Sequence, residues 1–403
     1  MLFISYTLLL ILIILISELT LRKLYSHKLW HQAFDDEYAL QKHDERGWAP
    51  KPHCQFDFHH RYLKGKNRVH FNNLGCHAHQ DYKKQKDNET LRIALFGDTT
   101  AVSYELTAEK TIAATLETLL NKKYPNRKIE VLNVSCKNYN TAQLYQWWHQ
   151  ELADFRIDIV LYLFVTNHPR RNITLHESGK PEIFSRPLFT IDANGIKHIT
   201  AKPHPVNIND MIYMLEDGRI ENIEGKPKSY ARRLIDYSII LSFLEDFRLG
   251  KTSIRNYKDR KEIKTLEKDN VKQKKDGDDS TSPYQWQLTE NILKQWSSDV
   301  KKTGAEFLVV PFLNYYHAGE GRLLRPHNNH PFGLDFNDIT ERKHLPQIAG
   351  NCGFIYFDAY QWAKEHNLTL QDTYLHPRYA YLTEQGATLH ARLIAEAIER
   401  FQL

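Results

Sequence analysis

The sequence is short of several residue types that mark particular classes of protein. It has four cysteines in 403 residues, and no pair of them has the CxxC spacing of zinc or redox sites. The formal net charge is only +5, a small excess for this length, so no nucleic-acid partner is expected. His77 and His79 have no carboxylate spaced with them as a metal site requires, so we expect no metal ion. We also expect no organic cofactor. Cys54 and Cys76 are compatible with a disulfide in an oxidising compartment, and four free thiols fit the sequence equally well.

The longest apolar run lies at the N-terminus. Residues 8–16 are all Leu or Ile, Glu18 then interrupts the run, and Arg22 and Lys23 close it. A helix that spans a bilayer needs about 20 apolar residues, so this run lies between a signal-peptide core and a short anchor. Because no small-x-small cleavage site follows, we predict an uncleaved membrane anchor over residues 1–24.

Short apolar runs alternate with helical patterns in two parts of the chain, 91–167 and 284–403. The predicted strands are 91–96, 129–134, 158–165, 305–312 and 353–358, and the predicted helices are 109–120, 141–152, 285–302 and 384–401. Strands that are apolar throughout and alternate with helices are typical of a parallel sheet covered on both faces. The sequence therefore predicts one α/β domain, with three α/β/α layers around a five-stranded parallel sheet.

The remaining segments have weaker patterns. Residues 25–90 are polar and rich in histidine, and we predict a lead-in with short strands. Residues 168–283 form a predicted insertion after the third strand, with a helical stretch at 231–247. Its charged part, 251–282, has few apolar residues and is predicted to be a solvated linker, with contact to anionic lipid or polymer as the alternative.

Ligands bind open parallel sheets beyond the C-terminal ends of the strands, so the residues that follow each strand are the candidates for function. Four blocks carry the signal: 96–100, 133–141, 165–168 and 381–387. In order and position they resemble the SGNH (GDSL-type) hydrolases, and most closely the membrane-anchored members linked to bacterial exopolysaccharide. The resemblance covers residues 47–403 outside the insertion. It implies an SGNH or flavodoxin-like version of the predicted sheet.

The resemblance also implies acyl-transfer chemistry. In that family a serine attacks an ester carbonyl, a histidine takes the serine proton, and an aspartate orients the histidine. Here the nucleophile position is Thr99 and the histidine position is Tyr381, five residues before Gly386. The aspartate position falls on Arg378 or Tyr379, and neither is a carboxylate.

The oxyanion site is better matched than the reacting groups. The family holds the oxyanion with a glycine in the second block and an asparagine in the third. The glycine position falls on Ser135 or Asn138, and the asparagine is present as Asn167. Asp98 precedes the nucleophile position, as in the family's Gly-Asp-Ser block, and completes the candidate substrate- or oxyanion-binding residues.

Since nucleophile, base and orienting residue are all changed, we expect little or no ester hydrolysis, because general-base assistance alone is worth about 10²–10⁴-fold. The leading hypothesis is a degenerate, membrane-anchored SGNH hydrolase-like protein that binds a glycan or a polysaccharide-export partner. One alternative is an active O-acyl esterase or acyltransferase that uses Thr99 with His376 and Asp372, and His390 is a second candidate base. Another is a scaffold subunit of a membrane complex.

The location of the chain is open to two readings. The basic residues after the apolar run favour a cytoplasmic position for the bulk of the protein. The resemblance favours a periplasmic or other extracytoplasmic position, and this is our prediction.

Overall fold

The fold is described from a computed structural model. It describes residues 2–25, 39–59, 63, 66–176, 186–193, 195–198, 211–214, 220–223, 238, 240–241, 283–313, 316–317, 322–323, 340–368, 373–376 and 379–402. The predicted linker 251–282 lies outside these residues, and only three positions of the helix predicted at 231–247 lie within them.

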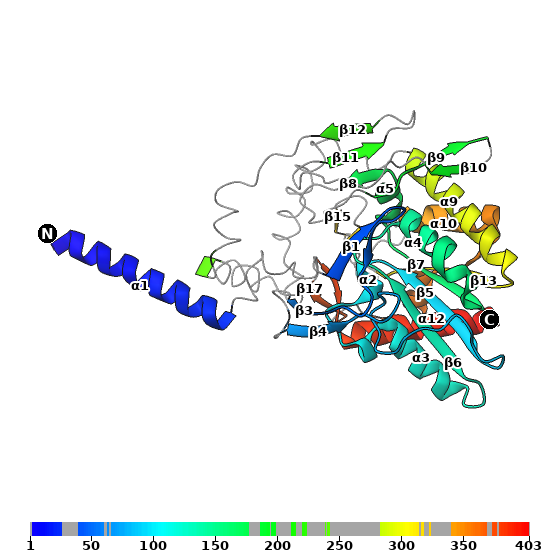
Figure 1. Ribbon diagram of the computed structural model, residues 1–403, viewed down its shortest axis with the longest axis horizontal. Coiled ribbons are helices and arrows are strands. Elements are labelled where there is room, and N and C mark those ends of the chain that lie inside the picture. Colours follow the sequence, from blue (N-terminus) through cyan, green and yellow to red (C-terminus); the bar gives the residue numbers. More distant parts are fainter. Residues whose placement is uncertain are drawn as a thin grey trace.

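A five-stranded parallel sheet forms the centre of the molecule (Figure 1), which confirms the predicted fold class. Its strands are β5 (Leu91–Gly97), β6 (Ile129–Ser135), β7 (Ile159–Phe164), β13 (Glu306–Pro311) and β16 (Ile355–Tyr356). They lie side by side in the order β6-β5-β7-β13-β16. In chain order this is 2-1-3-4-5, so the direction of winding reverses between β5 and β7, where doubly wound sheets bind ligands.

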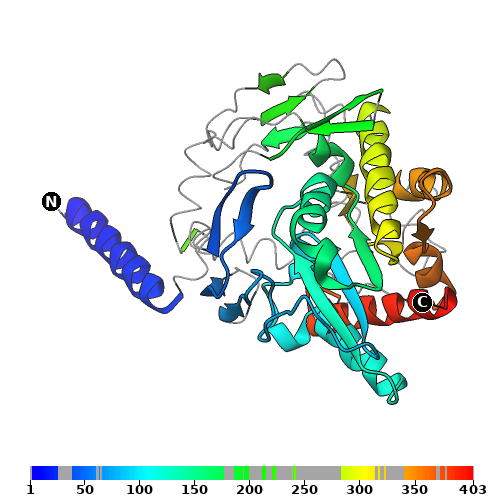
Figure 2. The same ribbon diagram turned by 45° about the vertical axis from the view of Figure 1, so that its right-hand side comes forward.

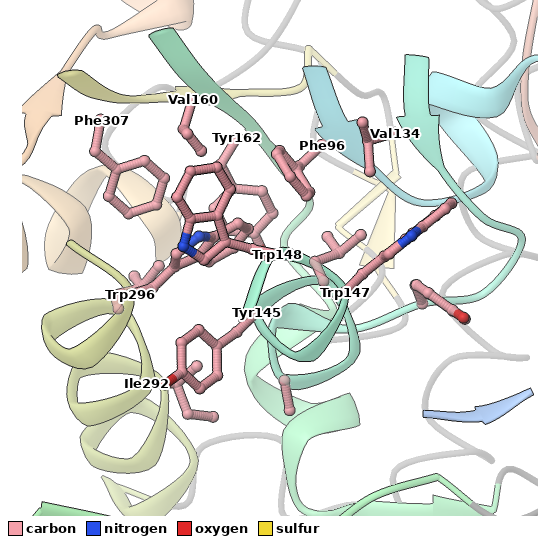
Figure 3. Close-up of a cluster of buried hydrophobic side chains, with 14 of the residues drawn as sticks. Phe96, Val134, Tyr145, Trp147, Trp148, Val160, Tyr162, Ile292, Trp296 and Phe307 are labelled. Atoms are coloured by element: carbon pink, nitrogen blue, oxygen red, sulfur yellow. The ribbon is translucent and has the colours of Figure 1, made fainter. Parts of the chain in front are cut away.

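Helices cover both faces of this sheet. On one face, α4 (Thr141–Trp147), α9 (Pro283–Lys302) and α10 (Thr340–Cys352) bury an aromatic cluster. In that cluster the ring of Phe96 from β5 meets the ring of Trp296 from α9 edge-on at 5.3 Å (Figure 3). On the other face, α3 (Ile112–Lys123), α11 (Ala359–Glu365) and α12 (Glu384–Arg400) bury aliphatic side chains such as Leu95 and Leu161. Both faces are buried, which explains why the strands are apolar at nearly every position.

Side-chain caps decide where several helices begin. The predicted helix at 109–120 starts later, at Ile112, because the Thr111 side chain accepts the Ala114 N–H. Helix α4 begins with a capping box between Asn140 and Gln143. It continues as a π-helix, Trp148–Leu152, so the predicted helix at 141–152 is helical throughout with a change of winding.

Smaller elements surround the central domain. The lead-in forms two antiparallel hairpins, β1 (Leu40–His43) with β2 (Gly47–Pro50) and β3 (Gln55–His59) with β4 (Lys66–His70). Three further strands pair as β12-β11-β8 in the insertion. The other short elements are α2 (Thr99–Val102), α5 (His168–Asn172), β8 (Thr174–His176), β9 (Phe189–Asp192), β10 (Gly195–His198), β11 (Met211–Met214), β12 (Ile220–Ile223), β14 (Tyr316–His317), β15 (Arg322–Leu323), β17 (Tyr374–His376) and β18 (Tyr379–Leu382).

The N-terminal residues form helix α1 (Leu2–Tyr25), which extends away from the sheet domain (Figures 1 and 2). Every side chain from Leu8 to Ile16 is between 48% and 62% exposed. Over the part of the chain that the structure describes, no helix has both the length and the apolar character needed to cross a membrane. All four cysteines are free thiols, so the disulfide considered between Cys54 and Cys76 is not formed.

Candidate functional site

The site lies at the C-terminal ends of β5, β6 and β7, beside the point where the winding of the sheet reverses. Gly97 ends β5, Asp98 follows, and α2 begins at Thr99. A Cβ atom on Gly97 would lie 2.4 Å from the Cβ of Ala101, so only glycine lets α2 fold back onto the end of the strand. The residue type at position 97 therefore sets where the Thr99 hydroxyl lies.

Asp98 is buried and anchors this turn. Its Oδ1 accepts hydrogen bonds from the backbone N–H and the hydroxyl of Thr100, both at 3.0 Å. Its Oδ2 accepts a hydrogen bond from Arg171 at 2.9 Å, and His168 Nε2 lies 3.7 Å away. Burial alone would raise the pKa of Asp98, but His168, Arg171 and the Thr100 N–H together lower it well below its usual range. Asp98 is therefore an ionised carboxylate that caps α2.

A hydrogen-bonded chain continues behind Asp98. The Nδ1 of His168 lies 2.5 Å from the Tyr162 hydroxyl, which lies 2.9 Å from the Thr141 hydroxyl. The Val165 N–H also points at Nδ1, at 3.4 Å, so Nδ1 is the acceptor and the ring proton is on Nε2, towards Asp98. Burial lowers the pKa of His168, with Asp98 acting in the opposite direction. This chain ties the ends of β5 and β7 to the start of α4.

Sequence reasoning missed the His168 chain, although a signal for it exists. His168 stands just after the third strand, in the same block as Asn167, and Arg171 follows three residues later. Their partner Asp98 is 73 residues from Arg171 in the sequence, and this separation hides the pairing.

The Thr99 hydroxyl is engaged on both sides by one residue. The backbone N–H of Asn138 donates to Thr99 Oγ1 at 3.0 Å, and Oγ1 donates to the Asn138 side-chain oxygen at 3.3 Å. Asn138 has a φ of +61°, in the left-handed region that asparagine tolerates better than most residues. Of the two positions considered for the second-block glycine, Asn138 is thus the one whose N–H reaches the nucleophile position.

The other two candidate oxyanion residues are buried nearby. Ser135 ends β6 and is fully buried, and its hydroxyl has no hydrogen-bond partner among the described residues. Asn167 stands at the N-cap position of α5, but its side chain does not cap the helix. Its side-chain oxygen is also buried without a partner in the described part of the chain. Such groups cost free energy unless water or a ligand pairs with them.

Tyr381 lies on β18, and β18 packs against α2, so the elements that carry Tyr381 and Thr99 are neighbours. The Tyr381 ring packs beside Phe58 of the β3–β4 hairpin, with 5.9 Å between ring centroids. The backbone of His376 pairs with Tyr379 across the β17–β18 hairpin. The side chain of His376 lies outside the described part of the structure, as do Asp372 and Arg378.

His390, the second candidate base, is a core residue. It is fully buried on α12, where its Nδ1 lies 2.8 Å from the Gly386 carbonyl oxygen and its ring stacks on Phe312 at 4.3 Å. Burial lowers its pKa to about 4. The hypothesis that His390 serves as the base is therefore wrong, because its ring is enclosed by the core between α12 and the sheet.

The described residues include no group of three or more His, Cys, Asp or Glu side chains arranged to hold a metal ion. The chemical groups of the site are two hydroxyls, two side-chain amides and a buried carboxylate–imidazole–guanidinium cluster.

Comparison with known proteins gives distant structural likenesses. No protein-family model and no curated protein matches the chain. A lipolytic protein of the G-D-S-L family from Desulfitobacterium hafniense is 10% identical, over 76% of this chain and 98% of its own, with a TM-score of 0.36. An acetylxylan esterase from Geobacillus stearothermophilus is 12% identical, over 78% and 96%, with a TM-score of 0.36. A GDSL-like lipase from Parabacteroides merdae is 9% identical, over 79% and 99%, with a TM-score of 0.35.

Proposed function

We propose that this chain is an SGNH-like protein that binds a glycan, or a partner in polysaccharide export, and hydrolyses esters slowly or not at all. The observation that carries the proposal is the pairing of the Thr99 hydroxyl with Asn138, at 3.0 Å to the backbone nitrogen and 3.3 Å to the side-chain oxygen. This pairing opposes catalysis in two ways.

The first concerns the nucleophile. A hydroxyl attacks an ester efficiently only when a base takes its proton, and that assistance is worth about 10²–10⁴-fold. The Thr99 proton points to a neutral amide oxygen, which is not a base. One of the two lone pairs of Oγ1 receives the Asn138 N–H, which lowers the nucleophilicity of the oxygen.

The second concerns the oxyanion. Tetrahedral intermediates are stabilised by N–H groups aimed at the developing negative charge. The Asn138 N–H, the candidate donor at this position, is already bonded to Thr99. A threonine also carries a methyl group that restricts χ1, which makes reorientation of the hydroxyl harder.

Binding of a glycan, unlike ester hydrolysis, requires no proton transfer from the groups of the site. The pairing of Thr99 with Asn138 does not use the NH2 group of the Asn138 side chain or the second lone pair of Thr99 Oγ1, and these groups can pair with sugar hydroxyls without any proton transfer. Asn167 adds a buried amide oxygen without a partner among the described residues. Acylated or plain polysaccharide is therefore the proposed ligand class.

Attachment to a lipid bilayer is a second part of the proposal. Leu and Ile side chains from Leu8 to Ile16 are about half exposed on every side of α1. Each such side chain gains about 1.5–3 kcal/mol when fully buried, so apolar cover is strongly favoured. We expect the purified full chain to float with phosphatidylcholine vesicles, and a variant with Ile11→Glu and Ile14→Glu to remain in the soluble fraction.

Ester hydrolysis is tested by the turnover of p-nitrophenyl acetate by three proteins: the wild type, Thr99→Ala and Thr99→Ser. We expect equal background rates for the wild type and Thr99→Ala. Thr99→Ser keeps the hydroxyl and removes only the methyl group, which gives the serine found in the family, and it is the matched variant. A wild-type rate that falls to background in Thr99→Ala would contradict the proposal and support an active esterase.

Ligand binding is tested by calorimetry with acetylated and deacetylated xylo-oligosaccharides. Binding that is weakened by Asn138→Ala but not by the exposed substitution Asn126→Ala supports the proposed site. Absence of binding to either probe would favour the scaffold alternative.

The active-esterase alternative is favoured by one observation. His376 pairs with Tyr379 in the β17–β18 hairpin, and β18 lies against the helix that begins with Thr99. If this alternative holds, His376→Ala and Asp372→Ala abolish turnover to the same extent as Thr99→Ala.

A further inference from the structure

A buried glutamate joins the two elements that carry Thr99 and Tyr381. Glu105 follows α2 after a short turn and is only 5% exposed. The side chain of Asn67 donates to the carbonyl oxygens of both neighbours of Glu105, to Tyr104 at 2.8 Å and to Leu106 at 2.5 Å. The backbone on either side of Glu105 is thereby held, and its side chain is directed inward.

The carboxyl of Glu105 reaches across to β18. Its Oε1 accepts the backbone N–H of Leu382 at 2.6 Å. Its Oε2 is buried and has no hydrogen-bond partner among the described residues. Leu382 itself is fully buried in the core beneath α3 and α12, whereas its neighbour Tyr381 packs against the β3–β4 hairpin. The Glu105–Leu382 hydrogen bond therefore lies at the point where β18 places Leu382 in the core of the sheet domain and Tyr381 against the core of the β3–β4 hairpin.

We propose that Glu105 is a positioning residue that holds β18 against α2 in its protonated form, so that loss of this proton loosens the Tyr381 side of the candidate site. The importance of Tyr381 and Thr99 rests on the proposed function, whereas the contact itself depends only on Glu105 and Leu382.

The protonation state follows from the surroundings. Burial raises the pKa of Glu105 to about 8, against the opposing effect of its own N–H and that of Leu382. The titratable groups on the elements around it are Tyr104 in the same segment, Tyr381 on β18, His77 bonded to Val102 of α2, and the exposed pair of Lys110 with Glu384. Among the described groups, none of these charges contributes to the shift, which has burial as its cause.

The direction of the pH effect follows from linkage. Below pH 8 the buried carboxyl is neutral and compatible with a closed interface. Between the pKa of a hydrated glutamate, about 4.5, and the buried value of about 8, each pH unit favours by up to about tenfold any state in which Glu105 is hydrated, and above pH 8 the effect levels off. Separation of β18 from α2 is the smallest motion that would hydrate it.

Hydrogen exchange of the full chain tests this inference, because it needs neither a ligand nor turnover. The measured quantity is the protection of the Leu382 amide between pH 6.5 and 9.5, corrected for the intrinsic exchange rate. We expect wild-type protection to fall by up to about tenfold per unit from pH 6.5 to about 8 and to level off above it. In Glu105→Gln, which keeps the acceptor and has no proton to lose, protection should not change with pH.

The core amide of Val310 is the internal control and should stay protected in both proteins. Constant wild-type protection across the range, or an equal loss in Glu105→Gln, would overturn the inference. Either result is independent of esterase activity and of glycan binding, so failure of this inference and failure of the proposed function are distinguishable.

Discussion

Arg171 donates to the carboxylate of Asp98 at 2.9 Å, and both side chains are buried. Their bond connects α5, after the third strand of the sheet, to the cap of the helix that presents Thr99. A buried ion pair is a weak source of net stability when intact, but removal of one partner leaves an uncompensated charge.

Arg171→Met is therefore expected to lower the free energy of unfolding by about 3–5 kcal/mol. Urea denaturation followed by tryptophan fluorescence measures the change. Arg127→Met at an exposed position is the control and should stay within about 0.5 kcal/mol of the wild type. An Arg171→Met protein as stable as this control would show that Asp98 does not depend on the guanidinium.

Gly97→Ala tests the close approach of α2 to β5. The new Cβ would lie 2.4 Å from that of Ala101, so α2 must shift, at an expected cost of about 1–3 kcal/mol. Gly350→Ala is a control of opposite sign, because a Cβ atom there would meet nothing within 4 Å beyond the local backbone of α10, and alanine favours a helix by about 0.5–1 kcal/mol. Thermal unfolding of both variants compares the two effects. Equal melting temperatures for both would contradict the steric argument.

Tyr162→Phe tests the chain behind Asp98. It removes the hydroxyl that joins His168 to Thr141, and the two buried partners lose a hydrogen bond. We expect a loss of about 1–3 kcal/mol in the free energy of unfolding. A double-mutant cycle with Thr141→Val should give a coupling energy of at least about 0.5 kcal/mol, and strictly additive effects would mean that the two hydroxyls do not interact.

Glu105→Gln tests the raised pKa through stability. A carboxyl with a folded pKa of about 8 and an unfolded pKa near 4.5 binds its proton more tightly in the folded state. Its contribution to stability therefore decreases as pH rises from about 4.5 to 8. The stability of Glu105→Gln relative to the wild type should rise across this window, by at most about 1.4 kcal/mol per pH unit, and level off above pH 8. Urea unfolding at pH 5, 6, 7 and 8 gives the difference, which would be flat if Glu105 titrates normally.

Local pattern was sufficient to predict the central sheet. All five predicted strands coincide with observed ones, and the last of them, β16, is shorter than predicted. The predictions worked because strands buried on both faces are apolar at consecutive positions, a signal that needs no knowledge of the partners. The start of α3 was predicted too early, because apolar spacing does not reveal the Thr111 cap.

The candidate site could be predicted only in part. The position of Thr99 follows from a short block after the first strand. Two features that decide its chemistry could not be predicted in this way. They are the two hydrogen bonds between Thr99 and Asn138 and the cluster of the Asp98 carboxylate with His168. The burial of His390 could not be predicted either, because the sequence pattern of a helix does not distinguish a histidine in a core from one at a surface.

By itself, the amino-acid sequence determined the alternation of apolar strands and helices, because those signals depend on neighbours within one turn or one strand. The tertiary structure alone decided the strand order and the partners of Thr99, Asp98 and Glu105. Those partners lie 39, 73 and 277 residues away, and only the packed sheet brings them within hydrogen-bonding distance.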